Sequence, residues 1–130
     1  SSRPGYAVSV KKTLAIIAHD GKKDEMAIFV ASHKDVLARF DLVGTGHTAK
    51  VAAGASGLPV RSVLSGPLGG DVQIAAEVLA GDICAVFFFV EQMEVHPHDP
   101  DIHTLQRTCN ITNTPIATNP ATAELIIKGL

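Results

Sequence analysis

Short apolar segments alternate along this chain with longer segments in which apolar residues recur every three or four positions. The short segments are typical of parallel strands buried on both faces, and they cover residues 14–18, 42–44, 60–64, 83–89 and 115–118. The longer segments have helical periodicity and cover residues 21–40, 48–55, 72–79, the surroundings of Leu105, and 121–128. Repeated strand–helix units predict an α/β protein, a three-layer α/β/α sandwich with a five-stranded parallel sheet.

Length and composition favour one soluble domain. The 130 residues are enough for a single core, and we expect residues 13–130 to form it, with a flexible N-terminal tail at residues 1–12. The longest apolar run is shorter than the roughly 18 residues of a membrane span, and a net charge of −2 gives no electrostatic argument for nucleic acid. Two isolated cysteines in apolar segments suggest buried thiols, so we expect a cytoplasmic protein.

Polar side chains follow four of the five predicted strands. In a parallel sheet, ligands bind outside the carboxyl ends of the strands, so these side chains are expected to share one rim. They are His19, Asp20 and Lys23 after the first strand, residues 44–48 after the second, Ser65 and Gly66 after the third, and residues 96–101 after the fourth.

Two of these segments have the chemistry of a phosphate site. Thr45, Gly46 and Thr48, like Ser65 and Gly66, offer hydroxyl groups and unobstructed N–H groups where helices begin, and Lys23 can neutralise an anion. The alternative is that Thr48 or Ser65 only caps a helix. Two such turns on adjacent strand ends favour anion binding.

Asp71 and Asp20 are candidate bases. A carboxylate that is partly desolvated near another one has a raised pKa, which suits proton abstraction beside a carbonyl. Either residue could instead cap a helix N-terminus, and spacing does not rank the two.

The segment from residue 96 to residue 101 contains His96, His98, Asp99 and Asp101. These are metal-ligand types, but no second cluster completes a metal site, and we favour acid–base chemistry without a metal. In that hypothesis a neutral His98, held by Asp101 or Asp20, donates to a substrate carbonyl. The alternative is a solvated turn in which Asp99 caps the following helix.

Five motifs in order resemble the methylglyoxal synthase family over nearly the whole chain. They are Ala-His-Asp at residues 18–20 with Lys23, Thr-Gly-x-Thr at 45–48, Ser-Gly-Pro-Leu-Gly-Gly-Asp-x-Gln at 65–73, Pro-His-Asp-Pro-Asp at 97–101, and Ala-Thr-Asn at 117–119. The resemblance implies flavodoxin-like layering, a homohexamer, no cofactor and no metal, and conversion of dihydroxyacetone phosphate to methylglyoxal and inorganic phosphate, with phosphate also an expected inhibitor.

The resemblance also implies residue roles. Asp71 is the base and His98 polarises or shuttles protons at the substrate oxygens, while Asp20 and Asp101 support the catalytic hydrogen bonds. The substrate and phosphate site comprises His19, Lys23, Thr45, Gly46, His47, Thr48, Ser65 and Gly66.

The chain departs from the family pattern at Glu91-Gln92-Met93, where Asp-Pro-Leu is usual, and at His47, where threonine is common. It also stops at Leu130, where some members continue. Two other functions remain open: a non-catalytic regulatory domain of the same fold that binds a phosphorylated ligand, and a metal-dependent hydrolase.

Overall fold

The computed structural model describes residues 11–94, 96–97 and 99–130. His98, the proposed proton shuttle, lies outside the described residues, as do residues 1–10 of the expected tail. The strands are β1 (Thr13–Ala18), β2 (Asp41–Thr45), β3 (Val60–Val63), β4 (Ile83–Phe89) and β5 (Ile116–Ala117). The helices are η1 (Asp20–Lys22), α1 (Lys23–Ser32), α2 (Lys34–Leu37), α3 (Gly46–Ser56), η2 (Gly66–Leu68), α4 (Gly70–Leu79), α5 (Ile102–Thr112) and α6 (Pro120–Gly129).

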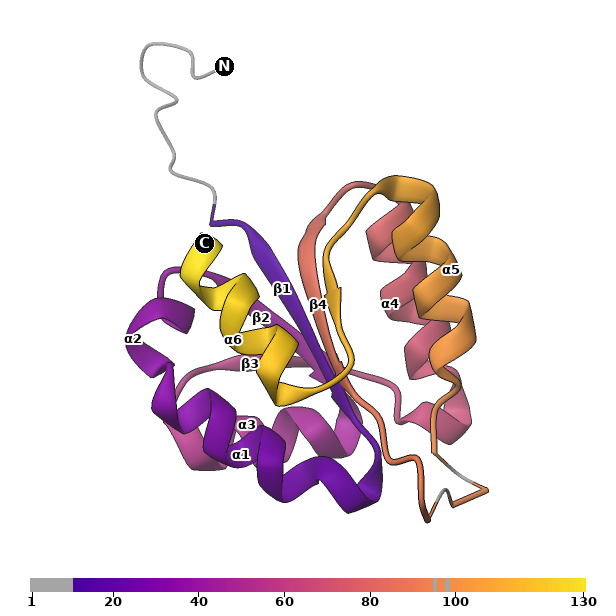
Figure 1. The fold of residues 1–130 in the computed structure, drawn as a ribbon, viewed down its shortest axis with the longest axis horizontal. Helices are drawn as coiled ribbons and strands as arrows, with labels where there is room; N and C mark the ends of the chain where they lie inside the picture. The colour runs from indigo at the N-terminus through magenta and orange to yellow at the C-terminus, as the bar shows by residue number, and fades with distance from the viewer. Residues whose placement is uncertain (1–10, 95, 98) are drawn as a thin grey trace, which may run out of the picture.

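All five strands are parallel and lie in the order β3-β2-β1-β4-β5, so β1 is the middle strand (Figure 1). The chain moves from β1 outward to β3, then returns to the other side of β1 for β4 and β5. The loops after β1 and β4 therefore diverge to opposite faces of the sheet. Such a topological switch point opens a crevice at the strand ends, which is the usual ligand position in a doubly wound sheet.

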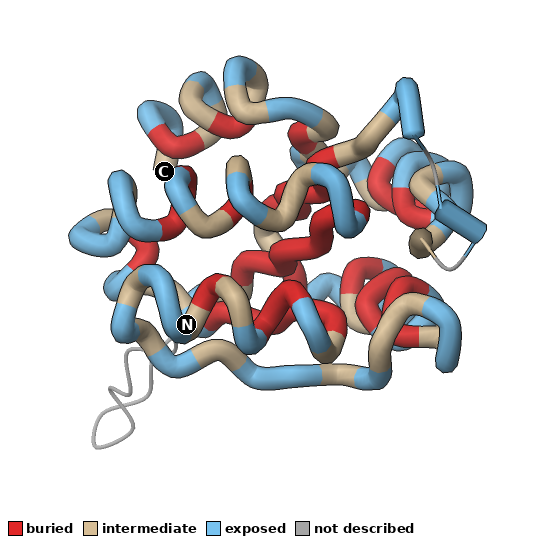
Figure 2. Tube along the Cα trace, turned by 90° about the horizontal axis from the view of Figure 1, so that it is seen from below, coloured by how far each residue is buried: buried red, intermediate tan, exposed pale blue. Residues whose placement is uncertain are grey.

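Helices cover both faces of the sheet, which confirms the three-layer prediction. Side chains that alternate along β1 and β4 separate two cores. One core joins the sheet to α1, α2, α3 and α6, and includes Ile16 and Phe87; the other joins it to α4 and α5, and includes Ile17 and Phe88. Figure 2 shows the buried residues in the strands and on the inward sides of the helices. Both faces of β1 and β4 are buried, which explains their uninterrupted apolar sequences.

The prediction of a single helix over residues 21–40 is wrong. This segment is divided into η1, α1 and α2, because His33 leaves helical geometry at φ −116° and ψ 22°. The bend directs Leu37, which is fully buried, into the core before the chain turns into β2. His33, expected on the surface, is half-buried, and its Nε2 lies 2.6 Å from Glu124 Oε2 of α6.

Other boundaries differ by small amounts that matter for the site. Helix α3 begins two residues before the prediction, at Gly46, and α4 also begins two residues earlier, at Gly70. Lys12, expected in the tail, already receives a hydrogen bond at its carbonyl from the Asp41 N–H, 2.9 Å away. Among the described residues, no helix is long and apolar enough to cross a membrane.

Candidate active site

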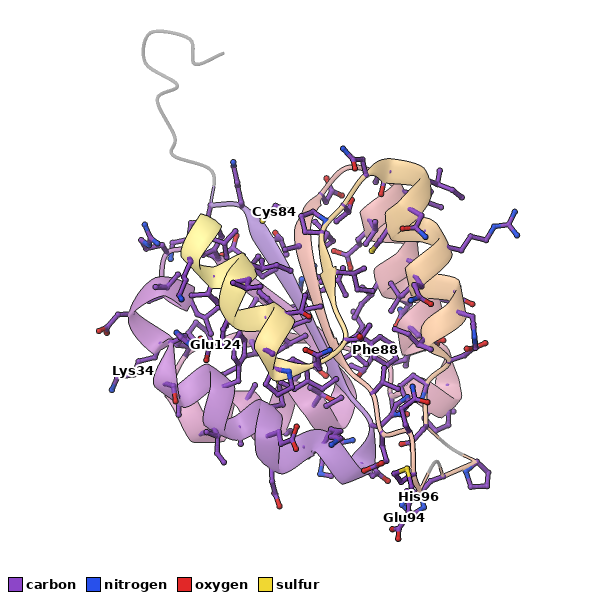
Figure 3. All side chains as sticks on the ribbon, in the orientation of Figure 1. Lys34, Cys84, Phe88, Glu94, His96 and Glu124 are labelled. Atoms are coloured by element: carbon purple, nitrogen blue, oxygen red, sulfur yellow. The ribbon has the colours of Figure 1, made fainter. Side chains whose placement is uncertain are left out.

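A pocket of about 250 Å³ lies at the carboxyl ends of the first three strands, closed on one side by the loop between β4 and α5. Figure 3 shows this loop, with Glu94 and His96 labelled, at the same end of the molecule as the end of β1. A pocket of this size suits a small molecule rather than a nucleotide. It is lined by Ala18, Asp20, Lys23, Thr45, His47, Thr48, Ser65, Gly66, Pro67, Asp99 and Pro100.

The turn between β2 and α3 presents the start of a helix to the pocket. Thr45 is the N-cap residue of α3 in extended geometry, and its side chain makes no capping hydrogen bond. The capping alternative for this turn therefore receives no support from Thr45. The first N–H groups of α3 have no partners within the helix, and their partial positive charge favours an anion. His47 is exposed at this position and lines the pocket.

Thr48 has a structural task. Its side chain is only 1% exposed, and its hydroxyl accepts a hydrogen bond from the Ala18 N–H, 3.2 Å away. The hydroxyl also lies 3.4 Å from the Thr45 hydroxyl, which donates to it. The Thr48 side chain thus joins the end of β1 to α3. The N–H of Thr48, rather than its hydroxyl, is the group at this residue best placed for a ligand.

The Ser65–Gly66 turn lies directly beside the start of α3. A Cβ added to Gly46 would be 3.4 Å from the Ser65 nitrogen, so the two backbones almost touch. Ser65 is the N-cap residue of η2, and its carbonyl accepts hydrogen bonds from the N–H groups of Leu68 and Gly70, each 3.0 Å away. The Ser65 side chain makes no capping hydrogen bond, so the capping alternative for this residue is not supported. Two helix starts therefore converge on one pocket.

Lys23 brings the cation to this pocket. Its Nζ donates to the Ala18 carbonyl, 3.1 Å away, and to Asp20 Oδ1, 2.7 Å away. The main-chain contact holds the ammonium group at the end of β1. Asp20 lies in η1 and does not cap α1, whose N-cap residue is Lys22, so that alternative is wrong. The pair places one positive and one negative group at the rim.

His19 is buried beneath the rim, and both of its ring nitrogens are engaged by the backbone of the loop between β4 and α5. The Glu91 N–H donates to Nδ1 at 3.0 Å, and Nε2 lies 2.8 Å from the Pro100 carbonyl. Because an N–H only donates, Nδ1 carries no proton, and Nε2 is the nitrogen that donates to Pro100. The resemblance implies a substrate contact for His19, but in this structure its ring holds the loop.

Asp71 lies in the first turn of α4 and is 8% exposed. The capping alternative is wrong for this residue, because the N-cap position is Gly69 and no side chain caps the helix. No hydrogen-bond or ionic partner for the Asp71 carboxylate occurs among the described residues. The residue is not part of the pocket lining, but the preceding Gly70 packs against Leu64 and Thr45 at the two turns. A nearly buried carboxylate without a partner is unusual outside functional sites.

Asp101, rather than Asp99, caps α5, so the alternative in which Asp99 caps this helix is wrong. The Asp101 carboxylate accepts from the His103 N–H, 2.9 Å away, and lies 2.8 Å from His103 Nδ1. The His103 N–H, followed by the His103 ring, lowers the pKa of Asp101. The exposed Asp101 side chain thus fixes the start of α5, at the end of the loop between β4 and α5.

The departure at residue 91 leaves a carboxylate next to η1. A Cβ on Gly21 would lie 2.8 Å from Glu91 Oε2, so the absence of a side chain at Gly21 makes room for the longer acid. Glu91 Oε1 accepts from the Met93 N–H, 2.8 Å away, and this bond lowers the pKa of Glu91. The loop therefore begins in a defined geometry although the usual proline is replaced by Gln92.

Among the described residues, no group of three or more His, Cys, Asp or Glu side chains is arranged to hold a metal ion. This statement does not cover His98, which belongs to the metal-site alternative and lies outside the described residues. Sequence reasoning gave no role to Pro100 or Gln73. The Pro100 carbonyl receives the His19 ring, and Gln73 Oε1 accepts from the Leu64 N–H at 2.8 Å. The first contact joins residues 81 positions apart and the second spans nine positions across the turn between β3 and α4, so the pattern of a single strand or helix does not indicate either one.

Comparison with known proteins gives a consistent result. The MGS-like domain family matches residues 25–118. A methylglyoxal synthase of Thermus thermophilus is 52% identical over 119 residues, which are 92% of this chain and 94% of that protein. One of Carboxydothermus hydrogenoformans is 49% identical over 117 residues, which are 90% and 97% of the two chains.

A solved structure agrees with these sequences. The crystal structure of a methylglyoxal synthase from Elizabethkingia anophelis superposes with a TM-score of 0.87 and 41% identity, covering 90% of this chain and 77% of that one. The family match covers more than half of the chain, and the two relatives align along almost their whole length. The chain therefore belongs to the MGS-like domain family, together with these methylglyoxal synthases.

Proposed function

We propose that this chain is a lyase that converts dihydroxyacetone phosphate to methylglyoxal and inorganic phosphate. The observation that carries the proposal is the convergence of two helix starts and Lys23 on one small pocket, near Asp71, a residue that is 8% exposed and whose carboxylate has no hydrogen-bond or ionic partner among the described residues. The first group of features suits a phosphate, and the second suits proton abstraction. The name of the relatives, methylglyoxal synthase, supports the product, and the substrate is the one that the family resemblance implies.

In the proposed reaction, Asp71 removes a proton from the carbon next to the substrate carbonyl. The electrons of that C–H bond form an enediolate, whose negative oxygen needs donors fixed in advance. As the enediolate collapses, a new carbon–carbon double bond forms and the bond between carbon and the phosphate oxygen breaks, so that phosphate leaves with the electron pair of that bond. The enol that remains then gains a proton on carbon and loses the proton on its oxygen to become methylglyoxal. Elimination requires that C–O bond to align with the π system, so the phosphate must be held in one orientation.

The backbone N–H groups of the Thr45–Thr48 and Ser65–Gly66 turns support that orientation, because they approach the pocket from two directions. Lys23 would exchange part of its contact with Asp20 for the phosphate as the substrate enters. His98 is our candidate donor to the carbonyl oxygen, and we assign Asp20 and Asp101 to the support of this network. Residues 13–130 would form the catalytic domain, and no organic cofactor or metal takes part in this scheme.

The decisive experiment is a colorimetric methylglyoxal assay with purified protein and dihydroxyacetone phosphate, comparing wild type with Asp71→Asn. The amide has nearly the same shape as the carboxylate but cannot accept the proton. We expect kcat to fall by at least about 1,000-fold, since the base is lost, while calorimetry shows retained phosphate binding. Asp35→Asn, an exposed change in α2, is the matched control and should keep full activity.

Each outcome has a distinct meaning. Full activity in Asp71→Asn would disprove the base assignment. If the wild-type protein were inactive but still bound phosphate, the result would refute the enzyme proposal and favour the alternative of a non-catalytic regulatory domain. Activity that disappears with a chelator would favour the hydrolase alternative. Inorganic phosphate is expected to compete with the substrate.

We also propose self-association, as the family resemblance to homohexamers implies. Exposed apolar side chains lie along η2 and α4: Leu68 of η2 (68% exposed), and Val72 (59%) and Leu79 (58%) of α4. Val72 and Leu79 are seven residues apart and therefore lie on one side of α4, and a second copy of the chain would remove these side chains from water. Light scattering should give six times the mass of the chain, and Val72→Glu should give smaller species.

For location we propose the cytoplasm. Cys84 and Cys109 are both free thiols, which suits a reducing compartment. Cell fractionation of the native host with an antibody against the chain tests this assignment; recovery outside the cytoplasm would contradict it.

A further inference from the structure

Two neighbouring residues after β1 donate hydrogen bonds to two neighbouring residues before α5, one through a side chain and one through the backbone. The His19 ring donates to the Pro100 carbonyl at 2.8 Å, while the Asp99 carboxylate accepts from the Asp20 N–H at 3.0 Å. Each side chain of the pair thus bonds to the backbone beside the other one. We call this reciprocal arrangement of His19 and Asp99 the clamp.

The clamp also holds the loop between β4 and α5 at two further points. The second oxygen of Asp99 accepts from the His96 N–H at 2.9 Å, and the other nitrogen of His19 accepts from the Glu91 N–H at 3.0 Å. Both carboxylate oxygens of Asp99 and both ring nitrogens of His19 therefore have backbone partners. Hydrogen bonds of this kind define where the loop lies, because a backbone group moves only with its neighbours.

The clamp joins two loops that would otherwise separate at the edge of the sheet. It spans the switch point, where the loops after β1 and β4 leave toward opposite faces of the sheet. The last sheet-type contact there is the His19 N–H to the Phe89 carbonyl, at 3.1 Å. Beyond it, His19 and Asp99 join the end of β1 to the loop after β4.

The charge of Asp99 strengthens these bonds. Burial raises the pKa of the Asp99 carboxyl, but the N–H donors of Asp20 and His96 outweigh burial, so the pKa lies below its ordinary value. Asp99 is therefore ionised at neutral pH, and both bonds are charge-assisted. The Asp20 carboxylate nearby opposes this effect, but Asp20 Oδ1 is itself paired with Lys23.

We propose that Asp99 is a positioning residue: through the clamp it fixes the backbone of Asp20, and with it the Asp20–Lys23 pair at the pocket. The expected effect of Asp99 on turnover depends on the function proposed above, but its structural effect on the Asp20 backbone does not. Lys23 is three residues from Asp20 and bonded to it, so a displaced Asp20 backbone displaces the cation that meets the phosphate. A displacement of about 1 Å at a reacting centre can reduce the rate by about 100-fold.

The test compares Asp99→Ala, which removes both acceptors, with Asp99→Asn, which keeps one, and with Asp35→Asn as the control. The first readout is amide hydrogen exchange by NMR, which needs no activity. We expect the Asp20 and His96 amides to exchange at least about 10-fold faster in Asp99→Ala, with an intermediate effect in Asp99→Asn. Amides in the middle of β1 should keep their wild-type rates.

The second readout is steady-state kinetics at a temperature where all variants are folded. We expect kcat/KM to fall by about 10- to 100-fold in Asp99→Ala, with partial retention in Asp99→Asn. Unchanged exchange at Asp20, or kcat/KM within twofold of wild type, would overturn the positioning role. An inactive wild-type protein would instead refute the proposed function, and amide exchange would still decide whether the clamp exists.

Discussion

The substitution Gly70→Ala tests how tightly α4 is joined to the third strand. Gly70 is the first residue of α4, and a Cβ added there would lie 1.8 Å from the Leu64 carbonyl oxygen. Backbone and Cβ atoms essentially never approach closer than 3.0 Å, so α4 and the end of β3 would have to separate by more than about 1 Å. The obstacle is backbone, which cannot rotate away as a side chain can.

The separation would weaken three hydrogen bonds around Leu64. They are the Gly46 N–H to the Leu64 carbonyl (3.4 Å), the Leu64 N–H to Gln73 Oε1 (2.8 Å), and the Gly70 N–H to the Ser65 carbonyl (3.0 Å). Overpacking costs about 1–3 kcal/mol, and each hydrogen bond contributes about 0.5–1.5 kcal/mol. We therefore expect a loss of about 2–5 kcal/mol in the free energy of unfolding.

The matched control is Gly54→Ala, the same chemical change inside α3. No atom lies within 4 Å of a Cβ at Gly54, and alanine is the better helix former, so this variant should be about 0.5–1 kcal/mol more stable. Urea denaturation of wild type and both variants measures the two effects. For a chain of this size, Gly70→Ala should lower Tm by roughly 8–15 °C, and Gly54→Ala should raise it by a few degrees.

The activity of Gly70→Ala at a temperature where it is folded gives a second check. Separation of α4 from β3 moves Asp71 relative to the Ser65–Gly66 turn, so kcat/KM should fall by about 100-fold or more. If Gly70→Ala were as stable as wild type, or gained stability like Gly54→Ala, the close approach described above would be refuted.

Three further predictions concern single side chains. Thr48→Val should lower the free energy of unfolding by about 1–3 kcal/mol, because the buried N–H of Ala18 loses its acceptor, and Thr48→Ser should restore most of it in the same urea titration. Gln73→Met should raise KM and the phosphate Kd by about 3- to 10-fold with kcat little changed, because the Leu64 N–H loses its acceptor. Gln73→Glu keeps an acceptor oxygen, so equal binding in Gln73→Met and Gln73→Glu would contradict this prediction. Burial raises the pKa of Cys109 to about 11, above the value in the unfolded chain, so stability is intact below about pH 9 and falls as pH rises toward 11; Cys109→Ala should flatten this part of a plot of unfolding free energy against pH.

The helix boundaries show where prediction from local pattern succeeds and where it fails. The strands of the central sheet are recognisable because β1 and β4 are buried on both faces and admit only apolar residues. The division at His33 is not recognisable, because no proline or glycine marks it and the cause is the burial of Leu37. Similarly, Asp99 and Asp101 both have the chemistry of an N-cap, and only the position of α5 decides between them.

The candidate site divides in the same way. By itself the sequence determined the sandwich of a parallel sheet between helices, and the polar groups expected at one rim, because apolar periodicity and turn residues act over a few positions. Only the tertiary structure decided that the Thr48 hydroxyl holds the end of β1 and that Asp71 is a buried residue that does not cap α4. It also decided that His19 and Asp99 join two loops about 80 residues apart. These roles depend on which atoms meet across the sheet, and the strand order β3-β2-β1-β4-β5, rather than any local pattern, brings them together.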